Sequence, residues 1–213
     1  MKRLLVVLAA LLLAASAQAN LLQNSDFEQG TVNQVPSFWA DVGLGPTYVP
    51  IVKNYNIPPT SNYHAEHISW SGLADAGYIY QQVNVDAGSV LTGVVDWVWY
   101  SSGLEPDNWH IFGIGIDPTG GTDWSAGTVV KTMAPVTVRS NWNYDLTVAD
   151  VDATGGGTVT VFLYSECVDD NAGWWAHAFD DAELTAEIIP EPCSLFALGA
   201  GLIGLIGMRR RRS

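Results

Sequence analysis

An alternation of apolar and polar residues runs through the middle of the chain and predicts β-strands. It places Trp97 and Trp99 on one face of a strand, where we expect both indoles to lie in the core. It also leaves Gly113 and Gly115 together on one strand face, with room for a neighbouring backbone or a bulky partner. The predicted strands are residues 78–85, 90–100, 111–117, 137–148, 158–164 and 179–187.

These runs are short, and Gly, Pro, Asn and Asp separate them, whereas helical periodicity is almost absent between residues 20 and 187. Regular short strands with such turn residues are typical of an all-β sandwich or barrel. About eight to ten strands in a body of this size fit a double-sheet jelly roll. We therefore predict one jelly-roll β-sandwich domain over residues 20–187.

The first 19 residues have the three parts of a secretion signal. Lys2 and Arg3 are positively charged, the apolar residues 4–15 follow, and residues 16–19 read Ser-Ala-Gln-Ala, an A-x-A cleavage pattern. The apolar run is short of the roughly 20 residues that a membrane-spanning helix needs. We expect a signal peptidase to cut after residue 19, so that the mature chain begins at Asn20.

The C-terminal residues 188–213 have three parts as well, a Pro-Glu-Pro triplet, an apolar helix over residues 194–208 and four arginines. Arginines that follow a membrane helix at once hold it with that end in the cytoplasm. This order resembles the PEP-CTERM sorting signal, carried here by Pro190, Glu191, Pro192, Arg209, Arg210, Arg211 and Arg212. The resemblance implies transient passage through the inner membrane of a Gram-negative bacterium. It also implies cleavage by an exosortase and a place on the cell surface or in the extracellular matrix.

Charge narrows the partners of the body. Residues 20–189 hold 3 Lys or Arg side chains against 21 Asp or Glu, a formal charge of −18. Nucleic acid is excluded as an expected partner because its phosphates require basic side chains. Cys167 is the one cysteine of this body, and we expect it to be a small buried residue.

Three stretches of the body resemble the galactose-binding-like jelly rolls, including carbohydrate-binding module families four, nine and twenty-two. Residues 20–28 read NLLQNSDFE, residues 82–88 read QVNVDAG, and residues 179–184 read FDDAEL. They resemble the opening, the central strand and the closing strand of that fold, in the same order. The resemblance implies the fold, whereas function has to be argued from a site.

Several relatives of that fold hold a structural Ca²⁺ between the opening and closing pieces. The resemblance implies Asp26, Glu28 and Asp181 as carboxylate ligands here, with backbone carbonyls completing the shell. Carboxylate and carbonyl oxygens are the ligands that Ca²⁺ takes. The alternative is that these side chains only cap turns. Residues 117–123 are a second oxygen-rich stretch, for which a plain Pro-Gly turn is the favoured interpretation.

Tryptophans in polar loops are the candidate sugar platforms, because an indole face can stack on the C–H face of a sugar. Asp and Asn beside them could hydrogen-bond its hydroxyls. The predicted ligand-binding residues are Trp109, Trp124, Trp174, Trp175, Asp107 and Asn171. Core packing is the competing interpretation for each tryptophan.

A catalytic or metal motif is not evident. His64 and His67 are three residues apart, so on a strand they face opposite sides, and we expect structural roles for them. The working hypothesis is a non-catalytic exported protein that binds extracellular polysaccharide. The alternatives are a purely structural matrix protein and a polysaccharide-active hydrolase or lyase.

Overall fold

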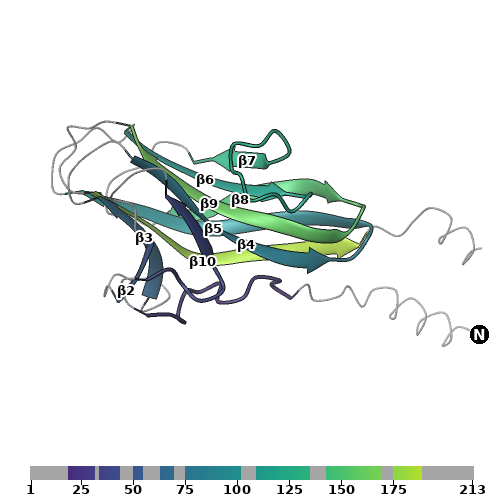
Figure 1. Ribbon diagram of the computed structural model, residues 1–213, viewed down its shortest axis with the longest axis horizontal. Coiled ribbons are helices and arrows are strands. Elements are labelled where there is room, and N and C mark those ends of the chain that lie inside the picture. The colour runs from purple at the N-terminus through teal and green to yellow at the C-terminus, as the bar shows by residue number, and fades with distance from the viewer. Residues whose placement is uncertain are drawn as a thin grey trace, which may run out of the picture.

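The computed structural model describes residues 19–31, 34–43, 50–54, 63–69, 75–101, 109–134, 143–168 and 175–188 (Figure 1). These residues form ten strands in chain order. The strands are β1 (Ala40–Gly43), β2 (Pro50–Asn54), β3 (Tyr63–Ser69), β4 (Asp75–Val85), β5 (Ser89–Ser101), β6 (His110–Asp117), β7 (Val130–Met133), β8 (Asn143–Ala153), β9 (Gly157–Cys167) and β10 (Trp175–Ile188). The described residues include no helix long and apolar enough to span a membrane.

Two five-stranded sheets face each other (Figure 1). One has the strand order β1-β4-β9-β6-β7 and the other the order β2-β3-β10-β5-β8, and every pairing is antiparallel. The expectation of an all-β jelly-roll sandwich is confirmed. The reason is the alternation in the sequence, which gives each sheet one apolar face that must be buried against the other.

The predicted faces agree with the burial of the side chains. Trp97 and Trp99 are 3% and 1% exposed and lie between the sheets, as expected. Cys167 is also buried, at 1%. At the same end of the sandwich, His110 of β6 and His177 of β10 join the two sheets through a buried hydrogen bond of 2.8 Å between Nδ1 and Nε2.

The opening stretch, residues 20–28, differs from a strand. It has turns and bends, and it lies along the last strand through two backbone hydrogen bonds. The amide of Leu21 donates to the carbonyl of Leu184 at 2.9 Å, and the amide of Ala182 donates to that of Ser25 at 2.8 Å. The opening and closing pieces therefore do meet, although only one of them is a strand.

Candidate functional site

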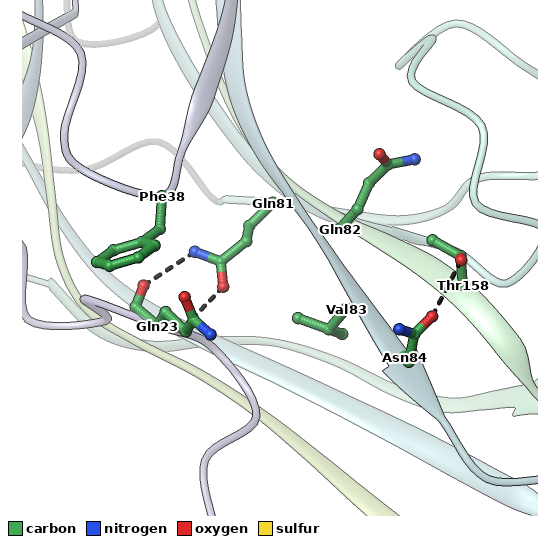
Figure 2. A pocket seen from close by; sticks show the side chains of 7 residues that line it. All are labelled: Gln23, Phe38, Gln81, Gln82, Val83, Asn84 and Thr158. Carbon is green, nitrogen blue, oxygen red and sulfur yellow. Dashed lines mark hydrogen bonds between the residues drawn. The ribbon is translucent and has the colours of Figure 1, made fainter.

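A pocket lies beside the second half of β4. β1 pairs with residues 77–80 of β4, and its first residue, Ala40, faces Tyr80. Among the described residues, the edge of β4 from Gln81 to Val85 therefore has no strand neighbour on that side. A cavity of about 390 Å³ follows this edge. It is lined by Gln23, Phe38, Gln81, Gln82, Val83, Asn84 and Thr158 (Figure 2).

The lining is polar but uncharged. None of the seven residues is ionisable, and five of them carry an amide or a hydroxyl group, which can donate and accept hydrogen bonds. Gln82 is exposed and donates through Nε2 to the carbonyl of Gly120 at 2.7 Å. Asn84 accepts from Thr158 Oγ1 at 3.1 Å through Oδ1. Within the described part of the chain, this leaves the amide oxygen of Gln82 and the amide nitrogen of Asn84 available to a ligand.

Phe38 forms the aromatic wall of the pocket. Its side chain is 59% exposed, and its backbone has a φ of 71°. A bulky residue rarely occupies this left-handed region, because its Cβ crowds the following carbonyl oxygen. In Figure 2 the ring lies beside Gln23 at one end of the lining, and Asn84 and Thr158 lie at the other end. An exposed apolar ring held in a costly conformation is a feature that often marks a functional site.

Gln23 and Gln81, beside Phe38, are joined by a reciprocal pair of hydrogen bonds. The backbone amide of Gln23 donates to Gln81 Oε1 at 2.7 Å, and Gln81 Nε2 donates to the carbonyl of Gln23 at 2.9 Å (Figure 2). Gln81 is buried, at 4% exposure, so these bonds satisfy its polar atoms. They pin the N-terminal stretch to β4 and hold Gln23 at the pocket.

The turn after β6 supports the other end of the pocket. Asp117 is buried and accepts from Thr119 N at 2.8 Å, Thr119 Oγ1 at 2.7 Å and Thr128 Oγ1 at 2.9 Å. Burial raises the pKa of Asp117, but these hydrogen bonds outweigh it and lower the pKa overall. The turn brings Gly120 so close to β9 that a Cβ there would lie 2.8 Å from the carbonyl oxygen of Thr158. The oxygen-rich stretch is therefore a Pro-Gly turn, as favoured from the sequence.

Trp124 lies in a loop, as predicted, but its indole packs inward. The ring edge covers Gly113 and Gly115 of β6, where an added Cβ would lie 3.0 Å from Cη2 and 2.6 Å from Cζ3. The ring stacks on that of Tyr164, with 4.8 Å between the ring centroids and 5° between the ring planes. Lys131 Nζ lies 4.6 Å from the centroid of the Trp124 ring. The side chain is 8% exposed. The two glycines therefore make room for this indole, and a sugar has no free ring face on which to stack.

Tyr164 is held in turn by a carboxylate. Its hydroxyl donates to Glu166 Oε2 at 2.7 Å, on the outer face of β9. Burial raises the pKa of Tyr164 strongly, and the hydrogen bond and negative charge of Glu166 raise it further. The phenol is therefore neutral over the physiological range and serves as a stacking surface for Trp124.

The remaining predicted ligand residues are divided between the core and undescribed stretches. Trp175 is not in a loop, as had been expected, but is the first residue of β10 and is 0% exposed. It packs with Cys167, and Trp109 lies partly buried against them. Trp175 is buried because its side chain packs across the sandwich against Cys167, which lies on β9 of the other sheet. Trp174, Asp107 and Asn171 lie outside the described residues.

The calcium expectation stays a prediction. The backbone bond between Ser25 and Ala182 brings the stretch that bears Asp26 and Glu28 next to the one that bears Asp181. The three residues are exposed, and their carboxylates are oxygen donors of the kind that Ca²⁺ takes. Within the described ranges, no group of three or more His, Cys, Asp or Glu side chains is placed to hold a metal. A calcium site here would depend on backbone carbonyls.

The pocket itself was missed by the sequence reasoning. Gln82 was assigned to the central strand of the fold, and Phe38 was not considered. The one local signal was Pro36-Ser37 before Phe38, which indicates a turn but not which way the ring points. Residues 1–18 and 189–213, with the two expected sorting signals, lie outside the described residues.

No protein-family model matches the chain, and no curated protein matches it. Among solved structures, the carbohydrate-binding module TmCBM61, in complex with β-1,4-galactotriose, is similar with a TM-score of 0.56 and 17% identity over 79% of this chain and 99% of that one. The Stig cyclase Fisc from Fischerella sp. TAU gives a TM-score of 0.52 and 14% identity over 82% of this chain and 100% of that one.

The enzymatically active domain of tailspike protein 4 of bacteriophage CBA120 is a third similar structure. Its TM-score is 0.52 and its identity 11%, over 79% of this chain and 21% of that one. At these identities the likeness establishes the fold alone, and the three structures come from a sugar-binding module and from enzymes. The chain thus has the β-sandwich fold of carbohydrate-binding modules, and its function has to be argued from its own residues.

Proposed function

We propose that this protein is a non-catalytic polysaccharide-binding module, and that the pocket along the open edge of β4 holds the sugar. The observation that carries the proposal is the combination at this pocket of one exposed aromatic ring, Phe38, with uncharged amide and hydroxyl groups. A sugar offers an apolar C–H face and several hydroxyls, and these two kinds of group complement them.

The electrostatic setting supports an uncharged polyol over an anion. The body has a formal charge of −18, and its basic residues Lys53, Lys131 and Arg139 are absent from the pocket lining. An anionic ligand would therefore meet repulsion without a paired cation. The ligand of the similar module, β-1,4-galactotriose, makes β-1,4-galactan a first probe to use.

We propose further that the protein is exported and retained on the cell surface or in the extracellular matrix. Residues 1–19 as a signal peptide and the Pro-Glu-Pro tail as a sorting signal support this proposal. Signal peptidase and an exosortase would be its processing partners. Mass spectrometry of the protein recovered from culture medium tests it, and an intact C-terminal arginine cluster would contradict it.

Binding is tested by retention of the purified protein on immobilised β-1,4-galactan, xylan and β-glucan, with reducing-end release measured in parallel. Retention without release of reducing ends is expected for a binding module. Release of sugar would favour the polysaccharide-active enzyme. A folded protein that none of a broad set of polysaccharides retains would favour the structural matrix protein.

A further inference from the structure

A buried carboxamide lies directly behind the aromatic wall of the pocket. Asn24 is 8% exposed and follows Gln23, another lining residue of the pocket. Its Nδ2 donates to the carbonyl of Gln29 at 2.7 Å and to that of Ser37 at 3.1 Å. Its Oδ1 accepts from the amide of Gln29 at 2.7 Å. One side chain thus ties three backbone groups of the stretch that ends at Phe38.

Further bonds close this stretch around the same residue. The amide of Ser37 donates to the carbonyl of Gln29 at 3.1 Å, and the amide of Trp39 donates to that of Pro36 at 3.1 Å. Trp39 Nε1 donates to the backbone carbonyl of Asn24 at 3.3 Å. The residues before and after Phe38 are therefore both attached to Asn24 or to its partner Gln29, and Phe38 is left with the left-handed φ of 71°.

These hydrogen bonds around Asn24 account for the unfavourable backbone conformation of Phe38. A non-glycine residue in the left-handed region is disfavoured against its extended form, so it persists only where its neighbours hold it. The stretch buries the Trp39 ring, which packs on Phe27 at 5.3 Å, but it leaves the Phe38 ring 59% exposed. Packing of Phe38 itself therefore gives little to offset its backbone cost.

Resting on the proposed function, we infer that Asn24 is the positioning residue of the pocket: it holds Phe38 so that the ring faces the sugar before the sugar arrives. Without the carboxamide, Phe38 populates extended conformations, and the binding-competent fraction falls. Apparent affinity falls with that fraction. The cost of a left-handed non-glycine residue corresponds to a five- to thirtyfold weaker affinity, as an order of magnitude.

The variant that isolates the side chain is Asn24→Gly. Asn24 has a φ of 50°, which glycine adopts without strain, so this change removes the carboxamide and leaves the backbone conformation accessible. Gln29→Ala is the matched control. It removes an exposed side chain at the same loop, whereas the bonds to Asn24 use the Gln29 backbone.

Amide hydrogen exchange of the ligand-free full-length protein is the first readout. The Ser37 and Trp39 amides are expected to exchange at least fivefold faster in Asn24→Gly than in wild type and in Gln29→Ala. The amide of Val161, in the central strand β9, should keep its protection, which shows that the sandwich is folded. Unchanged exchange at Ser37 and Trp39 would overturn the inference, whatever the protein binds.

Calorimetric titration with the polysaccharide retained from the β-1,4-galactan, xylan and β-glucan panel is the second readout. Asn24→Gly should weaken binding five- to thirtyfold in the wild-type background and not at all in a Phe38→Ala background. A purely structural role would give the same loss in both backgrounds and would overturn the positioning role. If wild type binds no polysaccharide, the proposed function fails, while the exchange result still decides whether Asn24 holds Phe38.

Discussion

Gly115→Ala would place a methyl group in the space that the Trp124 indole occupies. The added Cβ would lie 2.6 Å from Trp124 Cζ3 and 2.9 Å from Val129 Cγ1, both well inside ordinary contact distance. The indole cannot move away freely, because Tyr164 stacks on it and Lys131 lies over it. Overpacking of this kind costs about 1–3 kcal/mol of unfolding free energy.

Gly127→Ala is the control, since Gly127 lies in the loop that bears Trp124 and an added Cβ there meets no atom within 4 Å. Thermal unfolding measures both variants. About 1 kcal/mol shifts the melting temperature of a domain of this size by roughly 2–4 °C. Gly115→Ala is therefore expected to melt about 2–12 °C below wild type, whereas Gly127→Ala should melt at or slightly above the wild-type temperature.

A second background separates a clash with the indole from a general effect on β6. Trp124→Leu removes the ring edge that Gly115 contacts, so the further loss caused by Gly115→Ala should shrink in that background. The reasoning would be refuted if both alanine variants melted alike, or if the Gly115→Ala loss were undiminished without the indole. Either result would mean that the indole does not pack over β6, and Trp124 would again be a candidate for sugar stacking.

Three further predictions concern stability and metal binding. The pKa of Asp117 is lowered in the folded state, so its contribution to stability is present above the unfolded pKa near 4 and is lost as the pH falls through the lower folded pKa. Asp117→Asn should therefore lose about 1–3 kcal/mol of unfolding free energy at pH 7 and less at pH 3, as measured by urea unfolding. Equal losses at the two pH values would contradict this. His177→Ala removes one partner of the 2.8 Å bond between the sheets and leaves a cavity, so we expect a loss of about 2–5 kcal/mol in the same assay, and a near-neutral result would argue against that bond. Millimolar CaCl₂ added after EDTA treatment should raise the melting temperature of wild type but not of Asp181→Asn, and an equal response of both proteins would remove Asp181 from the predicted calcium site.

The fold could be predicted well because burial follows a two-residue period. The alternation that placed Trp97 and Trp99 in the core is a local signal, and the tertiary structure respects it. The sequence also indicated that Gly113 and Gly115 leave room for a neighbouring backbone or a bulky partner, and the structure shows a bulky partner, Trp124. The sequence could not identify that partner as Trp124, because the contact joins a strand to a loop about ten residues further along the chain.

The candidate site could not be predicted in the same way. The sequence favoured tryptophans as sugar-stacking residues because of their indole rings. Tryptophan also has a large apolar surface to bury, and Trp124 and Trp175 are both buried by packing. The pocket instead arises because β1 begins opposite Tyr80 and pairs with only part of β4, which is a property of strand pairing. Its aromatic ring is exposed because of a left-handed backbone at Phe38, and such a conformation depends on the distant Asn24.

Calorimetric titration of two alanine variants, each lacking one exposed aromatic side chain, tests the central claim most directly. Phe38 and Tyr144 have similar exposure, 59% and 55%, but Tyr144 lies on β8 in the other sheet. Against the polysaccharide that the wild-type protein retains, Phe38→Ala should weaken binding about tenfold or more, as removal of a stacking anchor does, and Tyr144→Ala should leave it unchanged. Unaltered binding by Phe38→Ala, or an equal loss in both variants, would contradict the placement of the sugar in the pocket along β4.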